Sequence, residues 1–106
     1  MNLSITARNY KAPDRLKKYL TEKLDKKKKM YEEVIDANIV LSYEKQVQVA
    51  EFRFKLNNKV LLVTEKSDDI FKSIDQALNN CERQIKKYKE RRREHKSNKI
   101  VDNLEV

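Results

Sequence analysis

The sequence predicts an α+β fold, a two-layer domain with the element order β-α-β-β-β-α. Four segments alternate apolar and polar residues, as half-buried strands do, and two longer segments repeat apolar residues at helical spacing. The 106 residues leave room for one modest core. Because each strand offers one apolar face and each helix one apolar stripe, we expect a four-stranded mixed sheet with both helices on one face. In outline this arrangement also describes double-stranded RNA-binding domains.

The first half of the sequence predicts a strand, a helix and a second strand. Residues 2–8 alternate between apolar and polar side chains. Pro13 suits the first turn of a helix, and apolar residues recur at helical spacing as far as Tyr31, so we expect a helix over about residues 13–32. Residues 35–43 alternate again. A strand, helix, strand unit favours a right-handed crossover, which makes the first two strands parallel neighbours.

The second half begins with an antiparallel meander. A third strand is expected at residues 50–56, with a bulge near positions 49 and 50, where the apolar phase changes. The chain contains no glycine, so a tight hairpin needs another residue that tolerates positive φ. We expect Asn57 and Asn58 to fill that role before a fourth strand at residues 60–64.

The second helix is the most clearly patterned element. Ser67 and the two aspartates after it favour a helix start, by capping and by negative charge near the helix N-terminus. An apolar stripe then continues to Tyr88, and basic residues beyond it suggest that the helix extends past the core as a basic rod. We expect one domain over residues 1–96 and a flexible tail over residues 97–106. The stripe comprises Ile70, Phe71, Ile74, Ala77, Leu78, Cys81, Ile85 and Tyr88.

The charge balance predicts a polyanionic partner, with nucleic acid as the first candidate. Lys and Arg number 25 against 17 Asp and Glu, a formal charge of +8. Residues 83–99 alone carry nine basic and two acidic side chains. The single cysteine cannot form an internal disulfide, and no apolar stretch suits a signal peptide or a membrane span. These features indicate a cytoplasmic protein that is not a membrane protein.

Catalytic motifs are weak, so we predict no enzymatic activity and no cofactor or metal. Without glycine there is neither a Walker loop nor a dinucleotide fingerprint. His95 lies in a charged run, as a solvated residue would, and Cys81 lies on the apolar stripe, as a structural thiol would. One His and one Cys are also too few ligands for an ordinary structural zinc site. Asp68, Asp69 and Asp75 could form a metal-dependent nuclease cluster, but the first two are better explained by the helix dipole.

Basic side chains form the remaining candidate site. At about 100° per residue, several of them fall opposite the apolar stripe of the second helix. The ordinary interpretation is a solvated helical face, but the local excess of positive charge favours contact with phosphate. If the helices lie side by side, basic residues of the first helix join this face, and Lys27, on that helix's apolar stripe, extends its ammonium to solvent. The candidate RNA-binding residues are Lys23, Lys26, Lys72, Arg83, Lys86, Lys87, Lys89, Arg91, Arg92 and Arg93.

Short matches in both helices and the first two strands carry a family resemblance. Their order and spacing are more specific than any one of them. The matches are residues 3–6, 16–26, 39–41, 69–71, 74–75 and 82–85. On this basis the chain, over about residues 2–95, resembles the ribosome hibernation promoting factor family, also known as ribosome-associated inhibitors or sigma-54 modulation proteins.

The resemblance implies a translation inhibitor that binds the small ribosomal subunit at its decoding region. It would occupy the mRNA channel and the A and P tRNA sites and silence translation reversibly. The implied partners are small-subunit rRNA and the 70S ribosome, and the positions matching the family's rRNA-facing residues are Lys23, Lys26, Arg83 and Lys87. The main alternative is a general structured-RNA-binding protein or RNA chaperone. A metal-dependent nuclease and an anionic-membrane binder rank far behind.

Several positions depart from the family pattern. Asn80 stands where relatives have Lys, and Lys27 stands where they have Leu. Ala12 replaces the usual Thr, which removes a capping hydroxyl before the first helix. Longer family members carry a second domain that pairs two ribosomes, whereas only residues 97–106 follow the basic rod here. We therefore expect a monomer when free, which inactivates single 70S ribosomes or needs a separate dimerising factor to pair them.

Overall fold

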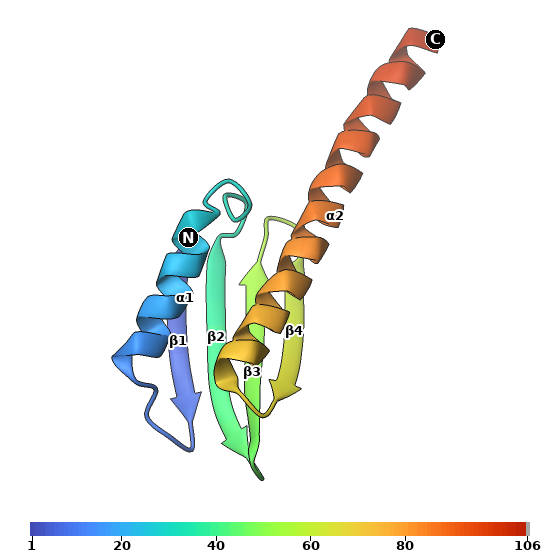
Figure 1. Ribbon diagram of the computed structural model, residues 1–106. Helices are drawn as coiled ribbons and strands as arrows, with labels where there is room; N and C mark the ends of the chain where they lie inside the picture. Colours follow the sequence, from blue (N-terminus) through green and yellow to red (C-terminus); the bar gives the residue numbers. More distant parts are fainter. Residues whose placement is uncertain (106) are drawn as a thin grey trace.

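A computed structural model describes the backbone of residues 1–105 and the side chains of residues 1–91. The element order is the predicted β-α-β-β-β-α (Figure 1). Six elements make up the chain: β1 Asn2–Arg8, α1 Asp14–Lys26, β2 Asp36–Glu44, β3 Val47–Lys55, β4 Val60–Ser67 and α2 Ile70–Glu105.

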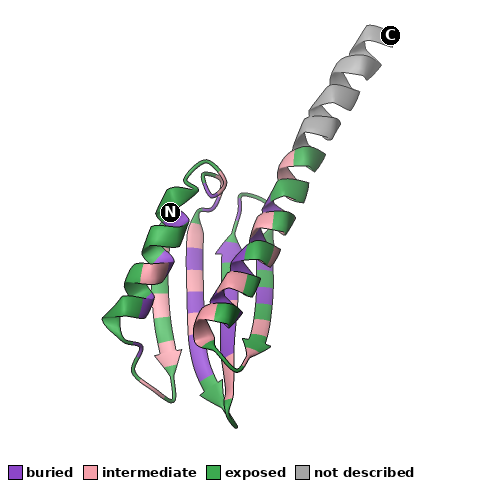
Figure 2. Cartoon of the chain, in the orientation of Figure 1, coloured by how far each residue is buried: buried purple, intermediate pink, exposed green. Residues whose placement is uncertain are grey.

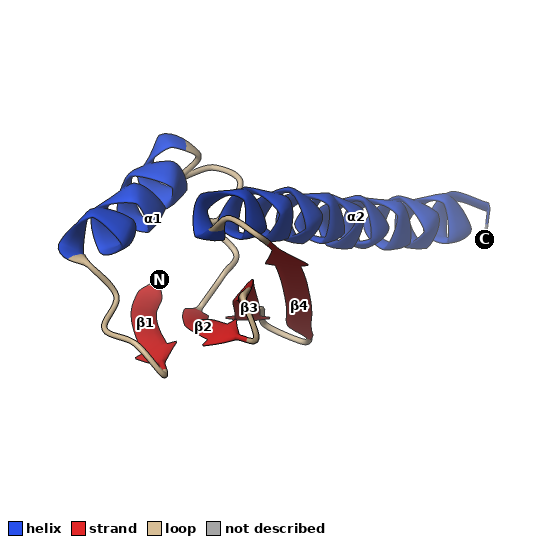
Figure 3. Ribbon diagram, turned by 60° about the horizontal axis from the view of Figure 1, so that its bottom comes forward, coloured by secondary structure: helices blue, strands red, loops and turns tan. Residues whose placement is uncertain are grey.

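The four strands form one mixed sheet in the order β1-β2-β3-β4. β1 pairs with β2 in parallel, and the remaining two pairs are antiparallel. Both helices cover the same face of this sheet, and α2 continues beyond its end (Figures 1 and 3). The predicted fold class and strand order are therefore confirmed.

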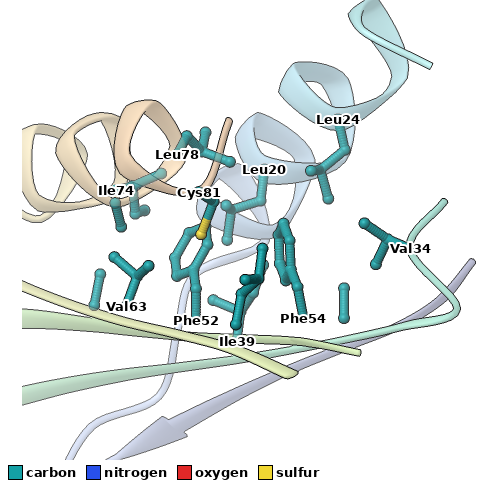
Figure 4. Packing of buried hydrophobic residues seen from close by; sticks show 14 of the residues in the cluster. Leu20, Leu24, Val34, Ile39, Phe52, Phe54, Val63, Ile74, Leu78 and Cys81 are labelled. Carbon is teal, nitrogen blue, oxygen red and sulfur yellow. The ribbon is translucent and has the colours of Figure 1, made fainter. Parts of the chain in front are cut away.

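The core lies between the sheet and the two helices. Strand residues alternate between buried and exposed positions along β2, β3 and β4 (Figure 2). Leu20 of α1 points toward Phe52 and Phe54 of β3, and Ile74 of α2 points toward Val63 of β4 (Figure 4). Cys81 is 0% exposed, and burial together with the neighbouring Glu82 carboxylate raises the pKa of its thiol to about 12. The prediction that Cys81 is a buried thiol of the core is confirmed.

The first helix is shorter than predicted. α1 ends at Lys26, and residues 27–33 form turns instead of the expected last helical turns. Tyr31 is nevertheless buried in the core, which explains why its spacing looked helical. The run of four lysines at residues 26–29 provides no apolar contact, and like charges three and four residues apart disfavour a helix. The N-cap residue of α1 is Pro13, one position after Ala12, and no side chain caps the start of this helix.

Two features of the meander differ from the prediction. β2 and β3 pair without interruption, so the predicted bulge near residues 49 and 50 is wrong. Val49 and Ala50 are 3% and 0% exposed, so the change of apolar phase reflects burial on both faces of the sheet. The positive φ angles of the tight hairpin belong to Lys45 and Gln46, at 46° and 68°, which join β2 to β3.

The turn at Asn57 and Asn58 needs no positive φ. It is closed by a backbone hydrogen bond in which the Leu56 amide donates to the Lys59 carbonyl at 2.7 Å. Positive φ angles are instead required at the hairpin between β2 and β3, where only two residues connect the strands and the turn must match their twist.

The connection from β4 to α2 follows the predicted capping with one change. β4 extends to Ser67, three residues beyond the predicted end, because Ser67 pairs with Gln48. Asp69 is the residue that caps α2, since its Oδ1 accepts a hydrogen bond from the Phe71 amide at 3.0 Å. The Ser67 hydroxyl instead bonds the Ser73 hydroxyl at 2.6 Å, which ties the strand end to the helix.

The helix α2 continues past Tyr88, as the sequence predicts for a basic rod. The expected boundary between a domain at residues 1–96 and a flexible tail at residues 97–106 stays a prediction, because side chains beyond Arg91 lie outside the described part of the chain. Among the described residues, no helix has the length and apolar character needed to span a membrane.

Candidate nucleic-acid interface

α2 presents a carboxylate to α1 near the start of the surface where the two helices meet. The Tyr19 hydroxyl of α1 donates a hydrogen bond to Asp75 Oδ1 at 2.5 Å. Lys23 Nζ lies 3.9 Å from the same oxygen and 5.3 Å from the centre of the Tyr19 ring. Asp75 therefore serves as a common partner for a phenol and an ammonium from α1.

A second carboxylate repeats this pattern two turns further along α2. Glu82 Oε1 lies 2.6 Å from Lys27 Nζ, and Glu82 Oε2 accepts a hydrogen bond from the Tyr31 hydroxyl at 2.9 Å. The Glu82 side chain is only 14% exposed, whereas that of Lys27 is 57% exposed, so solvent reaches this ion pair from the lysine side. We call these paired side chains the helix seam. The helix seam comprises Tyr19, Lys23, Lys27, Tyr31, Asp75 and Glu82.

The helix seam keeps its phenols protonated. Burial and the hydrogen bond to Asp75 raise the pKa of Tyr19 to about 12. Burial and the hydrogen bond to Glu82 likewise raise the pKa of Tyr31. Both hydroxyls are neutral donors at physiological pH. Each carboxylate accepts a hydrogen bond from a phenol and lies within ion-pair distance of a lysine ammonium group.

Lys89 continues the same side of α2, seven residues after Glu82. Its Nζ donates a hydrogen bond to the Lys29 carbonyl at 2.8 Å and lies 3.8 Å from Glu32 Oε1. Lys89, which the sequence predicted to bind RNA, therefore contacts the segment that follows α1.

A groove of about 200 Å³ lies between the helices at the helix seam. Its lining mixes both signs of charge with neutral side chains, so it is no simple anion pocket. The lining residues are Lys23, Lys27, Asp75, Leu78, Asn79 and Glu82.

The remaining candidate residues with described side chains point into solvent. They have no carboxylate within 4.0 Å among the described side chains, so their charges are uncompensated. Arg92 and Arg93 lie outside the described side chains. We call the exposed set the outward basic face. It comprises Lys26, Lys72, Arg83, Lys86, Lys87 and Arg91.

Sequence reasoning separated these two surfaces only in part. It placed Arg83 and Lys87 correctly opposite the apolar stripe, but it missed the helix seam. Lys27 follows the end of α1 with 57% of its side chain exposed, and Glu82 holds its ammonium group. The spacing of seven between Asp75, Glu82 and Lys89, about 100° from the stripe, was the available signal.

Asn80, at a position where the family resemblance implies a Lys, forms hydrogen bonds on the other flank of α2. Its amide donates to Glu65 Oε1 of β4 at 3.3 Å, and its oxygen accepts from Gln84 at 3.2 Å. The side chain is therefore part of the contact between α2 and the sheet. This position does not contribute to the outward basic face.

The aspartates considered for a nuclease site do not come together. Asp69 caps α2, and Asp75 lies in the helix seam. Within the described residues, no group of three His, Cys, Asp or Glu side chains could hold a metal ion.

Comparison with known proteins agrees with this architecture. The family model described as "Sigma 54 modulation protein / S30EA ribosomal protein" matches residues 3–93. The ribosome hibernation promoting factors of Klebsiella oxytoca and Escherichia coli K12 are 25% and 23% identical over 95 residues, which is 90% of this chain and all of each relative.

Two solved structures share the fold. A ribosomal subunit interface protein from Coxiella burnetii superposes with a TM-score of 0.79 at 22% identity, over 84% of this chain and 98% of that one. The N-terminal domain of Thermus thermophilus Protein Y gives 0.72 at 26% identity, over 83% and 99%. Since the family model covers most of the chain, the protein belongs to the sigma 54 modulation protein / S30EA ribosomal protein family.

Proposed function

We propose that this protein is a hibernation factor that binds the ribosome and inhibits translation. It uses the outward basic face to occupy the decoding region of the small subunit, where mRNA and the A-site and P-site tRNAs bind. Membership of the family supports ribosome binding, because its curated relatives are named ribosome hibernation promoting factors. Binding of this kind needs neither catalysis nor a cofactor.

One observation carries the proposal on the structural side. Exposed basic residues of α1 and α2 lie opposite the buried apolar stripes of these helices, while the acids between the helices are already paired. Unpaired cations on a rigid helix meet phosphates without first breaking internal ion pairs. A folded RNA surface with closely spaced phosphates is the partner that suits this face.

The mode of inhibition follows from occupancy. A protein held by phosphate contacts excludes other ligands from the same RNA surface, and it leaves when competing ligands or ions displace it. Inhibition would therefore be reversible, with no covalent change to the ribosome.

The test is selective binding to small ribosomal subunits in the presence of excess unrelated structured RNA. The protein should co-sediment with small subunits at near-physiological salt, and prebound mRNA with P-site tRNA should reduce that binding. Binding that the competitor RNA removes in proportion to its mass would instead identify a general RNA chaperone.

We further propose that the protein is a monomer when free and acts on single 70S ribosomes, or needs a separate factor to pair them. Mixing purified protein with purified 70S particles should leave the 70S peak in place during sedimentation. A dominant 100S peak at low protein excess would contradict this proposal.

A further inference from the structure

We infer that Glu82 is a positioning residue that holds residues 27–29, here called the lysine turn, so that Lys28 and Lys29 contact RNA phosphates beside α2. The inference rests on the proposed function, because it adds a contact surface to the same RNA-binding face. The candidate residues predicted from the sequence include neither of these lysines, and the predicted first helix, over about residues 13–32, contained both.

Both oxygens of Glu82 are used to hold the segment that follows α1. Oε1 pairs with Lys27, the C-cap residue of α1, and Oε2 accepts from Tyr31, a buried residue four positions later. One carboxylate therefore holds the residues on either side of Lys28 and Lys29, namely Lys27 and Tyr31, against α2. Lys89 adds a third tether two turns along, at the Lys29 carbonyl.

The tethers matter because the segment has no regular structure of its own. Residues 27–33 form turns, and adjacent lysines repel one another, so an untethered segment would sample many arrangements. Holding it in one arrangement before binding lowers the entropy cost of ordering it on RNA. The lysine turn is thus preorganised by charges that are not themselves offered to the RNA.

The tethered segment places free cations next to α2. Lys28 and Lys29 are exposed and form no ion pair among the described side chains. Lys86 lies on α2 between the two tethering residues, four positions after Glu82 and three before Lys89, so it faces the same side of the helix. Together these lysines extend the outward basic face across the helix seam.

Replacing Glu82 with Gln separates positioning from simple electrostatics. Glu82→Gln makes the protein more positive, so a purely electrostatic account predicts tighter binding to RNA. If Glu82 positions the lysine turn, affinity should instead fall about threefold or more, and the salt dependence should lose about one phosphate contact.

The matched control is Glu22→Gln. Glu22 is exposed on α1 and forms no ion pair among the described side chains, so its neutralisation changes the charge equally without releasing a tether. Affinities are measured with purified small ribosomal subunits over a range of salt concentrations. Binding by Glu82→Gln that equals or exceeds that of Glu22→Gln would overturn the inference.

A second pair of variants keeps the test decisive if Glu82→Gln is poorly folded. The double substitution Lys28→Gln with Lys29→Gln should weaken binding and remove up to about two phosphate contacts from the salt dependence. Its control is Lys55→Gln with Lys66→Gln, which removes the same charge from the sheet face that the helices leave uncovered. Equal binding by the two double variants would contradict the inference.

Failure of the inference is distinguishable from failure of the proposed function. If the wild-type protein does not bind small subunits, the proposed function and the inference about the lysine turn are both wrong. If the wild type binds and reversal of Arg83 and Lys87 removes binding, but Glu82→Gln and the Lys28/Lys29 variant bind normally, only the role of the lysine turn is wrong.

Discussion

Two stripes of α2 carry charge in opposite ways. Toward α1, Asp75 and Glu82 each meet a lysine and a tyrosine, and Glu82 is largely buried. On the outward side, Arg83 and Lys87 are exposed without a carboxylate partner among the described side chains. The charges of the helix seam form ion pairs between the helices, whereas the charges of the outward basic face repel one another until an anion binds. Whether a charged residue stabilises the fold or recruits a partner thus depends on which side of one helix it occupies.

The largest expected effect concerns the outward stripe and salt. If about six of its cations contact phosphates, affinity for small subunits should fall about a thousandfold between 50 and 200 mM salt. The stability of the free protein should change far less, because the seam pairs are partly buried. Equilibrium binding and urea unfolding over the same salt range measure the two responses. A nearly constant affinity would remove phosphate contact as the basis of binding.

Reversing two outward charges should break binding without breaking the fold. Arg83→Glu with Lys87→Glu places carboxylates against phosphate, and we expect a loss of about a hundredfold or more in affinity. Unfolding free energy should stay within about 0.5 kcal/mol per substitution, because both side chains are exposed.

The matched control for that reversal is Lys55→Glu with Lys66→Glu on the open face of the sheet. It changes the net charge equally, so it should weaken binding only through the general field of the protein. Similar losses in the two double variants would show that net charge, and not the outward stripe, determines affinity.

A substitution in the helix seam should lower the stability of the fold, in contrast to the charge reversal, which should lower affinity and leave stability unchanged. Tyr31→Phe removes the hydroxyl that donates to Glu82 and leaves the buried ring in place, so we expect a loss of about 1 kcal/mol in unfolding free energy. Tyr43→Phe, at an exposed tyrosine, is the control and should be nearly neutral. Urea unfolding of the two variants provides the comparison, and equal stabilities would mean that the Tyr31 hydrogen bond contributes nothing.

The smallest effect is a dependence of stability on alkaline pH. Folding raises the pKa of Tyr19 from 10.0 to about 12 and that of Cys81 from 9.0 to about 12, and it raises that of Tyr31 as well. Below about pH 8 these groups are protonated in both states, so their contribution is fully present. As the pH rises toward 12 the unfolded chain loses these protons first, and stability should fall.

Tyr31→Phe sharpens this measurement because it removes one of the raised groups. Unfolding free energies between pH 8 and about pH 11.5 should decline less steeply in this variant than in Tyr43→Phe or the wild type. Parallel curves for all three proteins would exclude Tyr31 as a source of the alkaline loss.

The order of elements and the identity of the core were predictable because both depend on local periodicity. The alternation in β1 and β3 and the stripe on α2 each report which side of an element is buried, without reference to any other element. The same reasoning placed Arg83 and Lys87 on the exposed side of α2 before any tertiary contact was known.

Tertiary structure decided where α1 ends, which turn takes positive φ, and which charges are free. Lys27 and Glu82 are separated by 55 positions in the sequence, so their contact depends on how α1 and α2 pack over the sheet. Tyr31 continues the helical spacing of α1, yet it lies in a turn after the helix, and its side chain is buried in the core. Local periodicity indicates which side of an element is buried. Which residue a polar side chain contacts depends on how segments far apart in the sequence pack together.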